Sequence, residues 1–94
     1  MEEVLPFDWD RENAGHIARH QITTREVEQV FGNDPLDIDF EVTGGEDRWT
    51  SIGHTDLLRV LVVIWTDRGD AIRPVTRYGA GRSATREYLA MKGL

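Results

Sequence analysis

Six of the seven arginines in the second half of the chain are the residues best suited to chemistry. They are Arg48, Arg59, Arg73, Arg77, Arg82 and Arg86. A planar guanidinium group binds two phosphate oxygens at once, so arginines on neighbouring strands can converge on one phosphate. His20 is the best candidate for moving a proton, because histidine titrates near neutral pH. These residue types predict a local phosphate-binding surface with an acid–base group.

The charge of the chain is divided between its two halves. Residues 1–47 contain 13 acidic and 3 basic side chains, and residues 48–94 contain 4 and 8, which gives −10 and +4 and a net charge of −6. A net acidic chain has no general attraction to nucleic acid, but a local excess of arginine still binds phosphate. In the first half, Asp37, Asp39 and Glu41 either keep a small protein soluble or bind a basic partner segment.

Several classes of protein are excluded by what the sequence lacks. It has no cysteine, which rules out disulfides and thiolate zinc sites and fits a reducing cytosol. Its first residues are acidic, unlike a signal peptide. Its longest apolar run, 60–65, is far shorter than the roughly 20 residues that cross a bilayer. We expect one soluble, cytoplasmic domain over residues 1–94 with no membrane contact.

A metal site is not expected either. His16 and His20 have the i, i+4 spacing of a zinc-binding pair on a helix, but the glutamate of the metalloprotease motif is missing between them. His54 is the only other histidine in the sequence. The sequence therefore predicts neither a metal nor a cofactor.

The candidate residues also have structural interpretations. A histidine such as His20 at the end of a helix interacts favourably with the helix dipole. Arg48 can pair with an acidic residue of the preceding strand across a hairpin. Arg73 and Arg77 are an even number of positions apart, so on a regular strand they share a face that contacts a partner or solvent.

Two helices are expected at the start of the chain. Asp10 can cap a helix that runs to about His20. Thr23 and Glu26 have the spacing of a capping box, and apolar residues then recur at helical intervals up to Phe31. Gly32 and the following asparagine end this second helix.

Four strands and a last helix are expected to follow. Residues 36–42 alternate between apolar and acidic side chains, which predicts a strand with one buried and one wet face. Residues 48–53, 57–66 and 71–78 read as further strands, the third of them central and the fourth moved toward a sheet edge by Pro74. Residues 83–91 predict the final helix. The order favours an α+β fold with two N-terminal helices, a four-stranded antiparallel sheet and a C-terminal helix.

The order of certain residues resembles the BrnT family of toxins. In that family an aromatic-x-Trp-Asp segment is followed by an Asn, a Lys-His pair and a Glu-x-Arg on the second strand. The matching positions, which span nearly the whole chain, are Phe7, Asp8, Trp9, Asp10, Asn13, Arg19, His20, Val30, Phe31, Glu46, Arg48 and Gly53.

This chain departs from the family pattern at two places. Arg19 stands where the family has lysine, which keeps the charge but loses an amine that can exchange a proton near neutrality. The family's C-terminal Ser-Ala-Arg segment corresponds to residues 76–82, so its key arginine is either Arg77 or Arg82.

The resemblance implies a RelE-like ribonuclease fold and metal-independent cleavage of messenger RNA, which inhibits translation. Such cleavage uses the 2′-hydroxyl of the substrate as nucleophile and needs a base, an acid and cations around the phosphorus. Aromatic side chains can stack on the bases, and the start of the last helix favours an anion. The candidate catalytic residues are His20, Arg48, Arg77 and Arg82. The candidate substrate-binding residues are Arg19, Trp49 and Tyr78.

The resemblance also implies a partner. A BrnA-like antitoxin with a ribbon-helix-helix part would form a hetero-oligomer with this chain and would alone contact operator DNA. The alternative is a catalytically weak or inactive relative that acts with its antitoxin as a protein-binding module in transcriptional autoregulation. The missing lysine, the altered arginine segment and the acidity favour this alternative, and RNA cleavage by the free protein separates the two.

Overall fold

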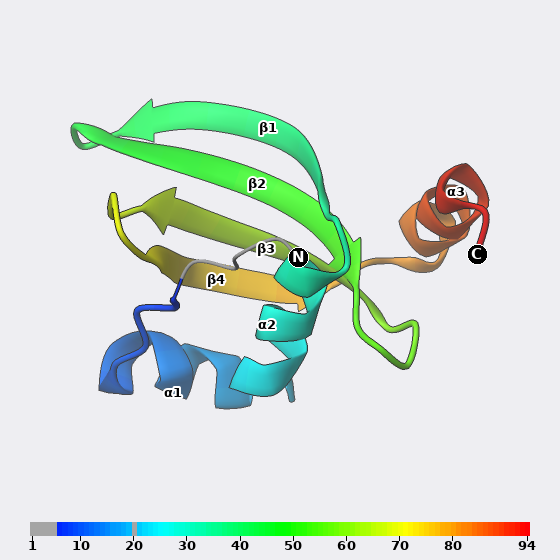
Figure 1. The fold of residues 1–94 in the computed structure, drawn as a ribbon, viewed down its shortest axis with the longest axis horizontal. Coiled ribbons are helices and arrows are strands. Elements are labelled where there is room, and N and C mark those ends of the chain that lie inside the picture. The colour runs from blue at the N-terminus through cyan, green and yellow to red at the C-terminus, as the bar shows by residue number, and fades with distance from the viewer. Residues whose placement is uncertain (1–5, 20) are drawn as a thin grey trace.

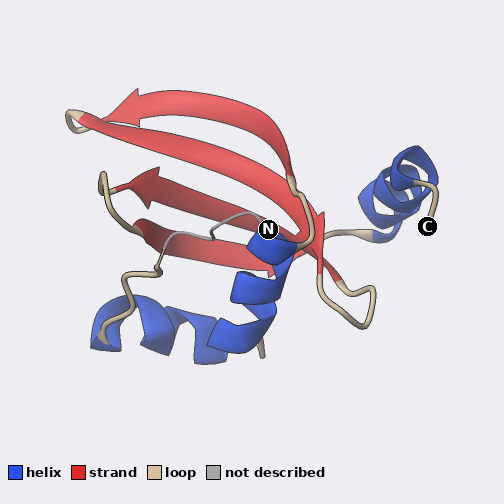
Figure 2. Ribbon diagram, in the orientation of Figure 1, coloured by secondary structure: helices blue, strands red, loops and turns tan. Residues whose placement is uncertain are grey.

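Helices flank an antiparallel sheet in this computed structural model, which describes residues 6–19 and 21–94 (Figure 1). In chain order, the elements of that part are α1 (Arg11–Arg19), α2 (Thr24–Gly32), β1 (Leu36–Thr43), β2 (Glu46–His54), β3 (Val60–Asp67), β4 (Ile72–Gly79) and α3 (Arg82–Lys92). Figure 2 shows the same order by type of element: two helices, four strands and a last helix. The α+β class predicted from the sequence is confirmed.

Both N-terminal helices begin at the predicted caps. The carboxylate of Asp10 accepts a hydrogen bond from the Asn13 N–H (3.0 Å), and the Asn13 side chain accepts one from the Asp10 N–H (2.7 Å). Thr23 and Glu26 form a complete capping box, in which each side chain accepts a backbone N–H of the other residue. These bonds satisfy donors that the first turn of a helix leaves unpaired.

The sheet has the order β1-β2-β3-β4, and its neighbouring strands are all antiparallel. The central position of β3 agrees with its apolar sequence. However, β3 begins at Val60 rather than at residue 57, because residues 55–59 form a tight turn with hydrogen bonds from Thr55 N–H to Arg59 O and from Leu58 N–H to Thr55 O. Leu58 in this turn has a left-handed backbone (φ 66°), and the Leu57 side chain is 93% exposed.

The core lies in two layers, one on each face of the sheet. On the first, here the α2 face, Leu61 and Val63 pack with Val27 and Val30 of α2. On the opposite α3 face, an apolar cluster forms around α3; its buried members are Ile52, Val60, Val62 and Tyr88. Odd-numbered residues of β3 therefore face α2 and even-numbered ones face α3, as strand geometry requires.

The close approach of α2 to the sheet depends on Gly53. A Cβ atom at this position would lie 2.6 Å from Cγ1 of Val30 and 3.1 Å from Cβ of Pro35. Because Val30 is fully buried, it has no room to move away. The absence of a side chain at residue 53 thus sets the distance between α2 and β2.

The two edges of the sheet differ. At the β4 edge, Phe7 forms a parallel bridge with Ile72, with bonds from Asp8 N–H to Ile72 O (2.8 Å) and from Ile72 N–H to Pro6 O (2.9 Å). The β1 edge is covered by no strand in the described part of the chain.

The prediction of one buried and one wet face for β1 is wrong. The register shifts between Asp37 and Asp39, which pair with Ser51 and Thr50 respectively, so the two aspartates lie on opposite faces. The apolar side chains are also uncovered, because α2 packs against β2 and β3 rather than β1. Ile38, Phe40 and Val42 are 56%, 45% and 63% exposed.

The prediction that Arg73 and Arg77 share a face is wrong for the same kind of reason. Arg77 pairs with Val63 on β3, whereas Arg73 pairs with Thr66, and an irregularity lies between these two pairs. The extra residue reverses the alternation, so Arg77 lies on the α2 face and Arg73 on the α3 face. Pro74, which cannot donate to the ladder, stands beside this bulge.

None of the described helices is long and apolar enough to cross a membrane.

Candidate functional site

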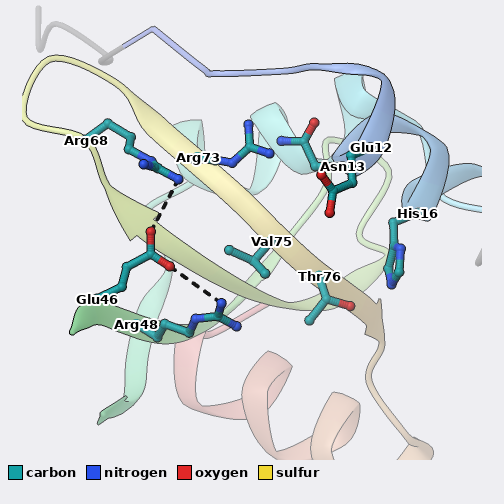
Figure 3. Close-up of a pocket in the computed structure, with 9 residues that line it drawn as sticks. All are labelled: Glu12, Asn13, His16, Glu46, Arg48, Arg68, Arg73, Val75 and Thr76. Atoms are coloured by element: carbon teal, nitrogen blue, oxygen red, sulfur yellow. Dashed lines mark ion pairs between the residues drawn. The ribbon is translucent and has the colours of Figure 1, made fainter. Parts of the chain in front are cut away.

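A cleft of about 260 Å³ lies where the α3 face of the sheet meets α1 (Figure 3). It contains three cations, two carboxylates and a histidine, with smaller residues between them. The residues that line it are Glu12, Asn13, His16, Glu46, Arg48, Arg68, Arg73, Val75 and Thr76. They come from α1, from β2, from β4 and from the turn between β3 and β4.

Glu46 connects two of the arginines. Its carboxylate lies 3.5 Å from Nη2 of Arg48 and 3.3 Å from Nη2 of Arg68. Glu46 and Arg48 are two positions apart on β2, so both side chains point to the same face of the sheet. Figure 3 shows the glutamate between the two guanidinium groups, with Arg48 directed into the cleft.

Arg48 keeps unused donors in this arrangement. Its ion pair with Glu46 is long, at 3.5 Å, and its buried Nε atom has no hydrogen-bond partner within the described residues. A guanidinium group carries five N–H donors, so Arg48 can bind further acceptor oxygens. An anion that enters the cleft would meet the donors of the terminal Nη atoms, since the Nε atom is buried.

Arg73 anchors the segment before α1 to the sheet. Its Nη1 lies 3.4 Å from Asp8, and its Nη2 lies 2.9 Å from Asp10. Partial burial alone would lower the pKa of Arg73, but the pairs with Asp10 and Asp8 outweigh it and raise that pKa. The same contacts hold α1 beside β4, where its residues reach the cleft.

His16 forms the opposite wall, next to Thr76 (Figure 3). His16 lies in the last turn of α1. The helix leading to it begins with a hydrogen bond from the Ala14 N–H to the Asp10 carbonyl. The cleft therefore places a histidine and a carboxylate on either side of a group of arginines. Histidine and carboxylate groups are the side chains that most often act in proton transfer.

Of the seven candidate site residues, Arg48 lies in this cleft. Tyr78 is on the same face of the sheet, since it pairs with Val62, but it does not line the cleft. Trp49 lies on the α2 face, where it stacks on Trp65 with ring centres 6.0 Å apart. Arg19 ends α1 with its side chain exposed.

The two alternatives for the key C-terminal arginine are both outside the cleft. Arg82 is exposed at the first position of α3. Arg77 is 0% exposed beneath α1, where its Nη2 donates to the Asn13 carbonyl (3.4 Å). Burial lowers the pKa of Arg77 to about 10. His20 lies outside the described residues.

Five residues of the cleft are not among the seven candidate site residues: Glu12, His16, Glu46, Arg68 and Arg73. Of these, Arg73 belongs to the arginines singled out from the sequence, and Glu46 belongs to the Glu-x-Arg match. The i, i+2 spacing of Glu46 and Arg48 was a usable signal, because it places both on one face of a strand. The others are brought in by a turn, a bulge and the docking of α1. Within the described residues, no cluster of His, Cys, Asp and Glu side chains is suited to hold a metal ion.

The fold and the cleft define a small α+β protein with an arginine-lined site suited to an anion. The chain belongs to the BrnT family: the family model described as "Ribonuclease toxin, BrnT, of type II toxin-antitoxin system" matches residues 9–86. That range runs from the segment before α1 into α3 and includes the whole cleft. No curated protein matches the chain. The family is one of ribonuclease toxins, and toxins of type II modules imply an antitoxin partner.

Proposed function

We propose that this protein cleaves messenger RNA without a metal ion, and thereby inhibits translation, at the cleft between α1 and the sheet. The observation that carries the proposal is the convergence of Arg48, Arg68 and Arg73 with Glu46 and His16 on one cleft. Cleavage through the 2′-hydroxyl of RNA needs these three kinds of group: cations, a proton acceptor and a proton donor.

The arginines suit the charge that develops during cleavage. Negative charge accumulates on the phosphate oxygens in the transition state, and fixed guanidinium groups stabilise it. Arg48 and Arg68 share a single carboxylate at contacts of 3.5 and 3.3 Å. A phosphate can therefore bind to both without breaking a strong ion pair.

Glu46 and His16 suit the proton transfers. In this proposal Glu46 accepts the proton of the 2′-hydroxyl, and His16 on the opposite wall supplies one to the leaving 5′-oxygen. Arg73, which is held by two aspartates, positions α1 and thereby His16. The fold family that the sequence suggests, RelE-like, agrees with such a division of roles.

The proposal includes the cellular context. The protein acts in the cytoplasm and is neutralised by a BrnA-like ribbon-helix-helix antitoxin, and the complex contacts operator DNA through the antitoxin. Family membership supports the antitoxin partner, and the remaining features come from the resemblance of the sequence.

The test is RNA cleavage by purified protein in the presence of EDTA. Wild type should cut single-stranded RNA, whereas Arg48→Ala and Glu46→Gln should be slower by on the order of 100-fold. Arg25→Ala, which changes an exposed arginine on α2, is the matched control and should keep wild-type activity. Circular dichroism of each variant checks folding.

Intact RNA with well-folded wild type would reject the proposal and favour a module that only binds its antitoxin. Cleavage that EDTA abolishes and Mg²⁺ restores would reject the metal-independent mechanism. Equal loss of activity in the Arg25 control would show that the cleft is not the site.

A further inference from the structure

The outer edge of β1 is open for pairing. No strand within residues 6–19 and 21–94 covers this edge, so it presents backbone N–H and C=O groups to solvent. At the opposite edge, the start of β4 is bridged at Ile72 by the segment around Phe7. Edge strands often bind a partner by taking an extended segment as an additional strand.

Apolar side chains flank this edge on both faces of the sheet. On the α2 face, Phe40 and Val42 of β1 are exposed, and Phe40 lies against Trp49 with ring centres 4.4 Å apart. On the α3 face, an apolar groove of about 150 Å³ runs between β1 and α3. Its lining includes Ile38 and Met91, both largely exposed.

This distribution fits an extended segment in particular. Side chains of a strand point alternately to the two faces of a sheet. A strand added beside β1 would therefore place one set of side chains near Phe40 and Val42, and the other set near Ile38. Exposed apolar surface that is arranged in this way usually marks an interaction site.

The negative charge of β1 favours a basic segment over a second copy of this chain as the added strand. Asp39 and Glu41 are exposed on the α3 face of the strand, because they pair with Thr50 and Arg48. A second copy of this chain that pairs through its own β1 would bring like charges together across the new strand pair, which is destabilising. A segment with lysine or arginine side chains would gain attraction at the same positions.

We propose that the outer edge of β1 binds an extended basic segment of the antitoxin as a fifth strand of the sheet. This inference rests on the proposed function, because the proposed function includes the antitoxin as partner. The β1 edge and the cleft involve different side chains, since neither Ile38 nor Phe40 nor Val42 lines the cleft. The Ile38/Val42 pair can therefore alter binding without changing a side chain of the cleft, whereas Glu41 pairs with Arg48 and is changed only together with a cleavage assay.

The experiment measures binding of the protein encoded beside this gene by isothermal titration calorimetry. The test variants are Asp39→Lys/Glu41→Lys and Ile38→Lys/Val42→Lys, all at exposed positions. Each pair should weaken binding about ten-fold or more, because favourable cross-strand pairs are replaced by repulsive ones. The matched controls are Asp70→Lys and Leu57→Lys, which change an exposed acid and an exposed apolar residue in turns away from β1.

Hydrogen exchange of the complex gives an independent readout. Backbone amides of β1 should become protected when the partner binds, because the outer edge then forms a hydrogen-bonded ladder. Unchanged exchange along β1 in a saturated complex would overturn the inference even if the lysine variants bind weakly through a change in overall charge.

The outcomes separate this inference from the proposed function. Tight binding that neither β1 pair weakens would place the interface elsewhere and overturn the inference, whereas RNA cleavage would be unaffected by that result. Absence of binding by wild type would also overturn it. Loss of RNA cleavage in Arg48→Ala with antitoxin binding retained would support both proposals together.

Discussion

Arg73 and Arg77 lie on opposite faces of the sheet, although an even number of positions separates them on β4. Their partners on β3 are Thr66 and Val63, three positions apart, because a bulge adds one residue between them. Arg73 thereby reaches the cleft, and Arg77 is buried beneath α1. One irregularity in the ladder thus divides two arginines between a surface role and an interior one.

The interior position of Arg77 predicts an unusual response to substitution. Burial lowers the pKa of this guanidinium to about 10, so it is still charged at pH 7, and its Nε and Nη1 have no hydrogen-bond partner in the described part of the chain. The free energy of unfolding of Arg77→Met in urea at pH 7 should therefore equal that of wild type or exceed it by about 1–2 kcal/mol. Because the folded pKa lies below the ordinary 12.5, this difference should shrink as the pH rises above 10.

Arg77→Ala is the control for this prediction. It removes the charge and also most of the side-chain volume, so it should be less stable than Arg77→Met by about 2 kcal/mol. A marked loss of stability in Arg77→Met itself would mean that the charge is compensated in the folded state.

The two candidate C-terminal arginines should differ from Arg48 in activity assays. Arg82 is exposed at the start of α3 and does not line the cleft. Arg82→Ala should therefore retain RNA cleavage within about two-fold, since a surface contact outside the site contributes little to the transition state. Induced expression of Arg82→Ala should arrest growth, and Arg48→Ala should not. Growth with Arg82→Ala at full soluble expression would instead move the site toward α3.

The Asp10 cap should give a specific dependence of stability on pH. Hydrogen bonding to Asn13 outweighs some desolvation and, together with the pair to Arg73, lowers the pKa of Asp10 below its usual 3.8. Ionised Asp10 therefore stabilises the fold at pH values above 3.8, and this contribution is lost as the pH falls through the lowered pKa. Asp10→Asn keeps a capping side chain but cannot titrate.

Thermal unfolding across an acid pH series measures this effect. The stability of wild type should fall more steeply below pH 3.8 than that of Asp10→Asn. Parallel curves for the two proteins would show that other carboxylates account for the acid response.

Gly53→Ala should destabilise the protein by about 2 kcal/mol. The new Cβ would lie 2.6 Å from Cγ1 of Val30 and would push α2 from the sheet. Val30→Ala removes that carbon. The double variant should therefore lose less unfolding free energy than the two single variants lose in sum. A double-mutant cycle by chemical denaturation measures this coupling; additive effects would place the strain at Pro35 instead.

The sequence predicted the elements because their signals are local. Helix caps at Asp10 and Thr23, the glycines of the turn at residues 44 and 45, and the apolar run of β3 each act within a few residues. The bulges at Ile38 and Val75 carry no comparable signal, because they depend on how two strands align. Every error about which residues share a face comes from one of these two bulges.

The site was harder to predict than the fold. Arg48 was found from its residue type and from the resemblance to a family, and the structure places it in the cleft. Arg68 and His16 join it from a turn and a helix that are far from β2 in the sequence. Such convergence depends on tertiary packing, which residue spacing alone does not encode.

The unlike edges of the sheet limit how copies of this protein can associate. Residues 6–8 hydrogen-bond along β4, so that side of the sheet has no free ladder near Ile72. If two molecules were to pair through β1, their β4 edges would face outward, and a third molecule would meet a ladder that is already occupied at Ile72. The occupied start of β4 would therefore hinder edge-to-edge growth beyond a pair, even when the partner is absent.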